Sequence, residues 1–468
     1  MIVESFSGVR SVCDASFLEK VPRYAEGYVS FLEEKCVGKD EGKDVVGGGG
    51  ARKGVVVIGR DSKVVGKEVV ELVTGVLLGH GFEVFDVGIL STPGIQHSVR
   101  QYKAVGGVIV TASHNPPEYS GIKFCRSDGG LLGQKDIEGV YADAKVNVPK
   151  KGEGKVVDKS SEALGSYVGF LKEKFPLRNP SRVMLDPNGG SAVPVLKELA
   201  KAYSSFVIVN DELSVYVRTS EPNQETLAGL KELMKKEGVE VGFGFDEDAD
   251  RVELVFDDAT VVNGNCVLAL ACDAILSGLP KGQVVVTNDA TSGVVLDVCK
   301  SYGARVEEAE VGEINVVDLL YELNAPVGGE GSCSGVVVPP SRCRDGILTC
   351  LLLLRLAEER GKSLKELVQE LPVYVAKRCE ERVEAGDVPL IREGLIGYFE
   401  EKGMSFQVRG DAFGSVKVWK ERGWIFFRAS RTEPGVFRIL VDAPTEAKAA
   451  EFLEEGKAIF KCVKEQAL

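Results

Sequence analysis

The chain has 468 residues, more than one hydrophobic core usually serves, which indicates three or four domains. Hydrophobic residues make up 44% and charged residues 27%, an ordinary balance for a soluble globular protein. The net charge of -13 argues against broad electrostatic binding to nucleic acid or to an anionic membrane, but not against a small anionic ligand. The start, MIVESFSGVR, lacks the pattern of a signal peptide, and the apolar runs are too short or interrupted to span a bilayer. We expect a cytoplasmic protein with no nucleic-acid or membrane partner; the sequence carries no signature of an oligomeric state.

Cysteine and histidine usage limits the metal and redox chemistry. The eleven cysteines form no CxxC pair, which favours reduced, mostly buried thiols, although a disulfide stays open for a hyperthermophilic source. Only three histidines are present, His80, His97 and His114, so a zinc site is not expected.

Short apolar runs alternate with helical patterns along most of the chain, which indicates βαβ units and largely parallel sheets. The first block predicts strands at 54–58, 83–87 and 105–110 with helices at 67–80 and 93–102. A second block predicts strands at 182–185, 206–209 and 239–245 with helices at 193–202 and 225–236. A third predicts strands at 283–287 and 305–308, with helices beginning at 266 and covering 293–302 and 314–323.

The last hundred residues differ. Strands are predicted at 373–381, 416–419, 424–428 and 436–441, with helices at 388–402 and 446–464. The expected fold is therefore α/β: three consecutive related α/β domains with mixed, mostly parallel sheets (1–155, 156–258 and 259–370), plus a smaller C-terminal α+β domain (371–468). A glycine-rich stretch at 37–54 reads as a loop, and it lacks the Gly-Lys-Ser/Thr order of a P-loop.

The most specific motif is VIVTASHNPPEYSGIKF, residues 108–124. A strand runs into a turn that Asn115 and two prolines force out of extended structure, so Ser113 is expected at the carboxyl end of a parallel strand, where ligands bind in α/β sheets. A serine held rigidly beside His114 and near Lys123 can carry and relay a phosphoryl group. An ordinary β-turn with a capping serine is the plain alternative.

A second motif, Gly-Phe-Asp-Glu-Asp-Ala-Asp-Arg, covers residues 244–251. Asp246, Asp248 and Asp250 point the same way if the backbone stays extended, and three converging carboxylates suit a hard cation such as Mg²⁺. An acidic surface turn is the plain alternative. Enzymes that form an aspartyl-phosphate also begin Asp-x-Asp after a strand, but they place Thr or Val where this chain has Asp250.

Two loops follow in the later blocks. Residues 328–335, GGEGSCSG, present Glu330 and Ser332, which can hydrogen-bond sugar hydroxyls. Residues 428–435, RASRTEPG, offer arginines, hydroxyls and turn amides, a combination that suits a phosphate clamp. A plain glycine-rich loop and a hairpin with exposed arginines are the respective alternatives.

Taken in order, these motifs resemble the phosphoserine, metal, sugar and phosphate loops of the α-D-phosphohexomutase family. Residues 6–10, FSGVR, resemble the family's N-terminal Ser-Gly-x-Arg-Gly segment, and 59–66 its Gly-Arg-Asp segment. Departures from the family pattern include Glu247 for glycine in the metal loop and Arg431 for Gly/Asn in the phosphate loop.

The resemblance implies a phosphotransferase that interconverts hexose 1-phosphate and hexose 6-phosphate (glucose, mannose or glucosamine phosphate) through phospho-Ser113. It implies Mg²⁺ as cofactor and a hexose 1,6-bisphosphate as intermediate and activator. The implied catalytic residues are Ser113, His114, Lys123 and Arg10. The implied metal ligands are Asp246, Asp248, Asp250 and Ser113, and the implied substrate-binding residues are Arg251, Glu330, Ser332, Arg428, Ser430, Arg431 and Thr432. A non-catalytic sugar-phosphate binding or regulatory protein on the same fold is the competing hypothesis.

Overall fold

The computed structural model describes residues 2–37, 53–142, 154–332, 334–430, 433 and 435–467. The chain forms two compact units: the first comprises Met1–Val262 and Ser334–Leu364, the second Asn263–Cys333 and Lys365–Leu468. Each is described by itself. Most of the glycine-rich stretch at 37–54 lies outside the described residues.

A seven-stranded mixed sheet begins the first unit, with strand order β1-β2-β6-β5-β3-β4-β7. Strand β3 pairs in parallel with β4 and β5, and β7 pairs in parallel with β4, whereas β6 is antiparallel to both β5 and β2. The bounds are β1 Val3–Ser5, β2 Gly8–Val12, β3 Val55–Arg60, β4 Glu83–Ile89, β5 Gly106–Val110, β6 Tyr119–Cys125 and β7 Val156–Asp158. Strand β7 thus extends the first sheet slightly beyond the boundary predicted at residue 155.

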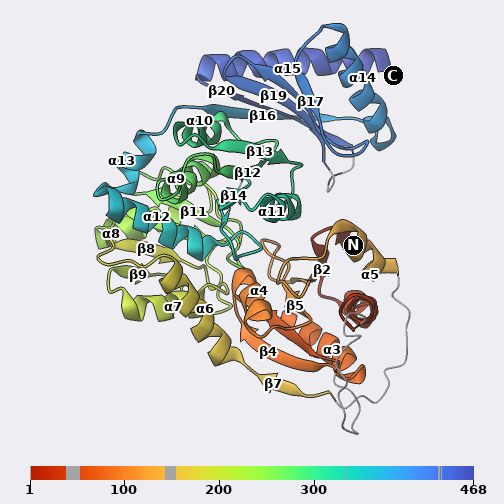
Figure 1. Cartoon of the computed structure of the whole chain (residues 1–468), viewed down its shortest axis with the longest axis vertical. Helices are drawn as coiled ribbons and strands as arrows, with labels where there is room; N and C mark the ends of the chain where they lie inside the picture. The colour runs from red at the N-terminus through yellow and green to blue at the C-terminus, as the bar shows by residue number, and fades with distance from the viewer. Residues whose placement is uncertain are drawn as a thin grey trace. The chain divides into compact units, whose positions relative to one another are not determined.

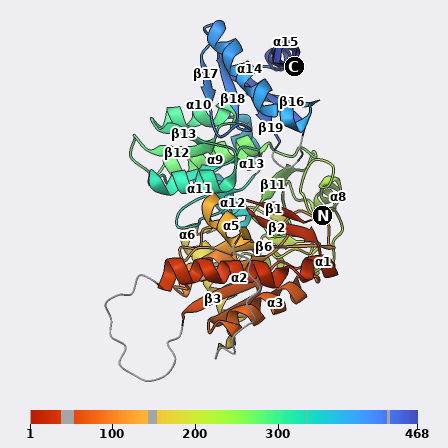
Figure 2. The same ribbon diagram turned by 90° about the vertical axis from the view of Figure 1, so that its right-hand side faces the viewer.

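Helices cover this sheet and supply its core. They are α1 Ala15–Leu18, α2 Val21–Leu32, α3 Gly66–Gly79, α4 Thr92–Gln101, α5 Gln134–Ala142 and α6 Ser160–Lys174, with a π-helical turn at Glu33–Val37 after α2. Helices α2 and α3 lie side by side (Figure 2), and their apolar faces pack on β3, β5 and β6 in one core cluster. Strand β5 begins with two glycines because a Cβ at Gly106 would lie 2.1 Å from the Tyr28 hydroxyl, and one at Gly107 would lie 2.4 Å from Val99.

A second sheet completes the unit in the order β11-β10-β8-β9, with β8 parallel to β9 and β10, and β11 antiparallel. The bounds are β8 Val183–Asp186, α7 Val193–Ala202, β9 Phe206–Ile208, α8 Ala228–Glu237, β10 Val241–Phe245 and β11 Val252–Phe256. The returning segment contributes β15 (Val336–Val337) and α12 (Gly346–Arg360), which packs against β11.

The second unit contains the third α/β block and the C-terminal sheet. Strands β12, β13 and β14 pair in parallel in the order β13-β12-β14. The bounds are α9 Gly264–Leu276, β12 Val284–Asn288, α10 Gly293–Ser301, β13 Arg305–Ala309, α11 Glu313–Glu322 and β14 Val327–Gly329.

The C-terminal sheet is five-stranded and antiparallel, in the order β16-β20-β19-β18-β17. Helices α14 and α15 lie together on one of its faces (Figure 1), and their apolar residues form its core. The bounds are α13 Leu364–Gln369, β16 Val375–Arg382, a 3-10 turn Ala385–Asp387, α14 Val388–Glu401, β17 Phe406–Val408, β18 Val416–Lys420, β19 Gly423–Ala429, β20 Val436–Ala443 and α15 Glu446–Ala467.

A buried cation joins the two parts of the second unit. The ammonium of Lys417, on β18, lies 2.7 Å from a carboxylate oxygen of Glu308 on β13, and the Lys417 side chain is 1% exposed. It also lies 4.1 Å from the ring centre of Trp419 and 5.2 Å from that of Trp424. Because a buried charge is tolerated only when paired, these contacts tie the C-terminal sheet to the third block.

The predicted fold class is confirmed: three α/β blocks with mixed or parallel sheets precede an antiparallel α+β domain. Among the described residues, no helix is long and apolar enough to cross a membrane. Nine of the cysteines are free thiols, five of them buried and four half-buried.

Candidate active site

Ser113 lies on a tight turn three residues after β5 ends at Val110. Its φ is +48°, in the left-handed region that non-glycine residues seldom adopt, and the side chain is 2% exposed. The hydroxyl of Thr111 accepts a hydrogen bond from the Ser113 amide at 2.9 Å, and the Lys63 ammonium donates to the Ser113 carbonyl at 2.7 Å. These contacts hold the backbone of the strained turn.

The three aspartates follow strand β10 and converge. One oxygen atom from each of Asp246, Asp248 and Asp250 lies within 4.8 Å of the others, and all three side chains are buried. The backbone does not stay extended here. The segment is a turn in which the Ala249 amide donates to the Asp246 carbonyl at 3.2 Å, and the φ of Ala249 is +55°. The turn, rather than strand alternation, brings the carboxylates together.

The turns of the first and second blocks meet at this cluster. The Ser113 hydroxyl donates to Asp246 Oδ2 at 3.4 Å. Asp248 Oδ2 accepts hydrogen bonds from the Lys123 ammonium at 2.9 Å and from the Thr92 hydroxyl at 2.7 Å. The structure thus brings Ser113, Lys123 and the aspartates together.

Burial and mutual repulsion divide the three carboxylates electrostatically. Burial, followed by the charges of Asp250 and Asp248, raises the pKa of Asp246 well above its usual value. Burial also opposes ionisation of Asp248 and Asp250. For Asp248, however, Lys123 lowers the pKa below the usual value, and for Asp250 Arg344 does so first. Lys123 and Arg344 thus favour the ionised forms of Asp248 and Asp250, whereas burial and the neighbouring carboxylates disfavour ionisation of Asp246.

The chemistry of this cluster fits a hard divalent cation. Oxygen donors in a buried group of three carboxylates suit Mg²⁺, and Asp248 Oδ1 is a buried oxygen without a hydrogen-bond partner among the described residues. Asp246, Asp248, Asp250 and the Ser113 hydroxyl are the groups that can hold such an ion.

Glu247 replaces a glycine of the family's metal loop but stays outside the cluster. Its carboxylate accepts a hydrogen bond from the Ser62 hydroxyl, and the side chain is 3% exposed. Burial, and then the charge of Asp61, raises the pKa of Glu247 to about 7. The substitution therefore leaves the three aspartates free to converge.

Two further predicted catalytic residues, Arg10 and His114, lie near the cluster, and so does Arg251, which was predicted to bind substrate. Arg10 lies on β2, and its pKa is lowered first by burial, with Asp248 acting in the opposite direction. Arg251 Nε lies 3.7 Å from Asp250 Oδ1 and 4.0 Å from Asp246 Oδ2. Burial, and then Arg251 and Arg10, lowers the pKa of His114 to about 4, so its imidazole is neutral at pH 7.

Three further polar residues at this site were not predicted as site residues. Arg344 lies 3.0 Å from Asp250 Oδ2, Lys63 contacts Ser113, and Thr92 contacts Asp248. Lys63 follows the Gly-Arg-Asp motif and Arg344 belongs to an Arg-Asp-Gly motif, so a signal existed for both. Thr92 had no such signal in the sequence, because it lies in none of the motifs.

The sugar-loop and phosphate-loop residues belong to the second unit. Glu330 follows β14; its Oε1 accepts from the Asn288 amide at 3.0 Å and from the Gly312 backbone amide at 2.9 Å, and the residue is 7% exposed. Ser332 is exposed. Arg428 is the next-to-last residue of β19 and lies near Asp289; burial raises the pKa of Asp289, and Arg428 is one of the groups that act in the opposite direction.

The Ser430 hydroxyl accepts a hydrogen bond from the Glu433 amide at 3.1 Å, as expected in a tight turn. Arg431 and Thr432 lie outside the described residues.

Comparison with known proteins decides the family. The three α/β/α domain models of phosphoglucomutase/phosphomannomutase match residues 44–149 (domain I), 165–259 (domain II) and 263–374 (domain III). A phosphoglucomutase/phosphomannomutase of Thermococcus kodakarensis is 33% identical over 419 residues, covering 87% of this chain and 90% of that protein. The chain belongs to the phosphoglucomutase/phosphomannomutase family.

Solved structures of this phosphohexomutase fold cover the whole chain. A phosphoglucomutase/phosphomannomutase family protein from Burkholderia thailandensis superposes with a TM-score of 0.81 at 23% identity, covering 99% of this chain and 98% of that one. An Aspergillus fumigatus N-acetylphosphoglucosamine mutase, solved with GlcNAc-6P and magnesium, has a TM-score of 0.61 at 14% identity and covers 98% and 95%. The chain is a phosphohexomutase, an isomerase of phosphosugars, as its four motifs predicted.

Proposed function

We propose that the enzyme interconverts hexose 1-phosphate and hexose 6-phosphate through a phosphoserine at Ser113 and a hexose 1,6-bisphosphate. The observation that carries the proposal is the Ser113 hydroxyl, which is held on a strained turn and directed at a buried cluster of three aspartates. A strained backbone is found where the surrounding structure holds it in place, often at functional sites. A hydroxyl beside a cation site is suited to hold a phosphoryl group.

The transfer consists of two balanced halves. In the first, the P–Oγ bond of phospho-Ser113 breaks, phosphorus bonds to the free hydroxyl oxygen of the sugar phosphate, and the proton of that hydroxyl ends on Oγ of Ser113. In the second, the other phosphate of the bisphosphate returns to Oγ of Ser113, and a proton returns to the sugar oxygen. The sugar must turn end for end between the halves.

The residues around Ser113 supply charge and proton transfer. Lys123 and Arg10 offer positive charge to the phosphoryl oxygens, while the neutral imidazole of His114 can accept the hydroxyl proton. A Mg²⁺ ion held by Asp246, Asp248 and Asp250 would neutralise charge on the transferring phosphate. The buried hydroxyl of Ser113 also limits the access of water, which would otherwise hydrolyse the phosphoserine.

The substrate is proposed as glucose, mannose or glucosamine phosphate. The relative from Thermococcus kodakarensis is named for glucose and mannose phosphates, and the Aspergillus structure holds a glucosamine derivative. Glu330 and Ser332 are the proposed ligands of the sugar hydroxyls. Arg428, Ser430, Arg431 and Thr432 are proposed to hold the phosphate that is not being transferred, and Arg251 is a further proposed substrate-binding residue.

Intact mass tests the proposal directly. The purified enzyme should carry one phosphate on a fraction of molecules, phosphatase should remove it, and Ser113→Ala should lack it and turn over neither glucose nor mannose 1-phosphate. Ser120→Ala, at a buried serine of β6, is the matched control and should keep the phosphate. Full turnover by Ser113→Ala would rule out the phosphoserine. Tight binding of hexose phosphates without turnover by the wild type would favour a binding protein instead.

A further inference from the structure

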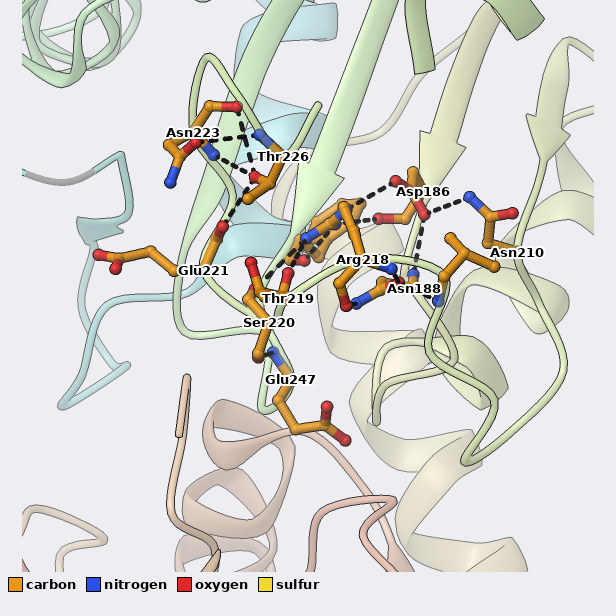
Figure 3. Close-up of polar contacts among 12 residues, drawn as sticks. Asp186, Asn188, Asn210, Arg218, Thr219, Ser220, Glu221, Asn223, Thr226 and Glu247 are labelled. Carbon is orange, nitrogen blue, oxygen red and sulfur yellow. Dashed lines mark hydrogen bonds and ion pairs between the residues drawn. The ribbon is translucent and has the colours of Figure 1, made fainter. Parts of the chain in front are cut away.

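A short segment of the first unit contacts the metal loop at three successive points. We call residues 218–221 the strap. An Arg218 Nη donates to the Phe245 carbonyl at 2.8 Å, immediately before the loop. The Ser220 hydroxyl accepts from the Glu247 amide at 3.0 Å, within the loop. The Glu221 carboxylate accepts from Arg251 at 3.2 Å, immediately after it. Figure 3 shows Ser220 of the strap beside Glu247, and Arg218, at the start of the strap, beside Asp186.

The strap is itself anchored at the end of β8, the strand next to β10. Arg218 Nε donates to Asp186 Oδ2 at 3.0 Å. The Asn188 side-chain oxygen accepts from the amides of Val217 and Arg218 at 3.0 and 3.2 Å, and its nitrogen donates to the Arg218 carbonyl at 3.1 Å. Asn210 donates to the other oxygen of Asp186 at 3.0 Å. These contacts, all drawn in Figure 3, give the strap one position relative to the sheet.

Arg218 holds most of this arrangement together. Its side chain is 7% exposed and that of Asp186 is 2% exposed, so the ion pair is buried from solvent. The guanidinium also donates to the carbonyls of Thr219 and Ser220 at 3.2 and 3.3 Å. A buried ion pair adds little net stability, because desolvation offsets the attraction, so the use of such a pair lies in the geometry it specifies. No substitute side chain offers five donors in a rigid planar fork.

That geometry matters because the conformation of the metal loop is unfavourable in itself and needs support from neighbouring residues. Oxygen atoms of three buried carboxylates lie within 4.8 Å of one another, and Ala249 occupies the left-handed region. The strap also lines a pocket of about 300 Å³ together with His114 and Asn115 of the phosphoserine turn. A shift of the strap would therefore move the metal loop and this pocket wall at the same time.

We propose that Arg218 is a positioning residue that sets the affinity of the aspartate cluster for a divalent cation, acting through the strap on the backbone of the metal loop. The inference rests on the metal site of the proposed function. Arg218 touches neither the aspartate cluster nor Ser113 through any of the hydrogen bonds above, so its effect must pass through Phe245, Ser220 and Glu221.

Binding of Mn²⁺ to the purified, metal-free enzyme, followed by electron paramagnetic resonance, measures this without turnover. Arg218→Lys should raise the Kd for Mn²⁺ at least tenfold, and Arg218→Ala should raise it further, with partial rescue by millimolar guanidinium. Arg182→Ala is the matched control. Arg182 also donates to a carboxylate and a carbonyl, those of Glu237, but its side chain is 51% exposed. Its loss should change the Kd less than twofold.

The possible outcomes distinguish a failure of the inference about Arg218 from a failure of the proposed metal site. If the wild type binds Mn²⁺ and folded Arg218 variants bind it within twofold, Arg218 is structural only and the inference is overturned while the proposed function stands. If the wild type binds no Mn²⁺, the metal site and the inference fail together. Should neither Arg218 variant give a native circular dichroism spectrum, Ser220→Ala carries the test, and an unchanged Kd in that variant overturns the inference.

Discussion

The Lys123 ammonium lies 2.9 Å from Asp248 Oδ2, and the two side chains are 6% and 1% exposed. Lys123 lies on β6 of the first block and Asp248 on the turn after β10 of the second. The pair therefore joins the phosphoserine turn and the metal loop in the first unit. It also fixes the charge state of both groups: although burial opposes charge on Lys123, the Asp248 carboxylate raises its pKa overall.

Lys123→Met should destabilise the protein by about 3–5 kcal/mol, because it leaves Asp248 buried without its cation. Urea denaturation midpoints measure the loss. Lys155→Met is the control: Lys155 lies 3.0 Å from Glu83 but is 57% exposed, and a surface pair of this kind contributes about 0–1 kcal/mol. Equal losses in the two variants would show that the buried pair has no special role.

Asp246→Asn should leave the metal-free protein at least as stable as the wild type, since it removes a carboxylate that its neighbours already disfavour. The same variant should lose the stabilisation that Mg²⁺ gives to the wild type, which is seen as a rise in Tm. This stabilisation amounts to about 2.7 kcal/mol when the Mg²⁺ concentration is a hundred times Kd. Thermal melts with and without Mg²⁺ measure both. Asp211→Asn, at an exposed residue paired with Lys197, should behave as the wild type. A full Mg²⁺ response in Asp246→Asn would exclude this carboxylate as a ligand.

The stability of the first unit should carry a pH signature of Asp345. This residue caps α12 by accepting from the Leu348 amide at 2.9 Å and also accepts from the Tyr167 hydroxyl at 2.7 Å. Burial raises its pKa from 3.8 to about 6. Between about pH 4 and pH 6 the unfolded chain therefore binds fewer protons than the folded one. The stabilisation that follows from the raised pKa of Asp345 is about 3 kcal/mol. It is present in full below pH 4 and is lost as the pH rises through 6.

Asp345→Asn keeps the shape of the cap but cannot ionise. The difference in unfolding free energy between this variant and the wild type should shift in favour of the variant from pH 4 to pH 6 and be constant above. Urea titrations at pH 4, 5, 6 and 7 measure it, with Asp14→Asn as the control at an exposed N-cap of α1. A pH-independent difference would contradict the raised pKa.

The fold and the motif order were accessible from the sequence because both depend on local signals. Apolar periodicity located β10 and α7, and the turn chemistry of Asn115 and the prolines placed Ser113 at a strand end. The conformation of the metal loop was not accessible, since Ala249 adopts a positive φ that its side chain does not favour.

Long-range partners were also missed. The contact of Arg344 with Asp250 and the anchoring of the strap by Arg218 join residues far apart in the chain, and no local pattern specifies them.

Glu330→Gln should weaken catalysis on every sugar that the enzyme accepts. Glu330 Oε1 is held by the Asn288 amide and the Gly312 amide, where α11 begins, so the carboxylate has a fixed direction. A glutamine can keep these two contacts through its carbonyl, but it replaces an anionic acceptor for sugar hydroxyls with an amide group. The value of kcat/KM should fall by an amount that corresponds to about 1–3 kcal/mol of free energy, seen mainly as a higher KM. The reason is that buried hydroxyls of the sugar are left badly paired. Steady-state kinetics on glucose 1-phosphate and mannose 1-phosphate measure it.

The phosphate on Ser113 should remain in this variant, because Ser113 and Glu330 belong to different units of the chain. Glu307→Gln is the matched control: it lies on β13 of the same block, 40% exposed and paired with Arg305 at 2.6 Å, and should leave the kinetics unchanged. Wild-type kinetics of Glu330→Gln on both sugars would place the sugar-binding carboxylate elsewhere. A loss confined to one sugar would make Glu330 a determinant of specificity instead of a general ligand, since glucose and mannose differ only at C2.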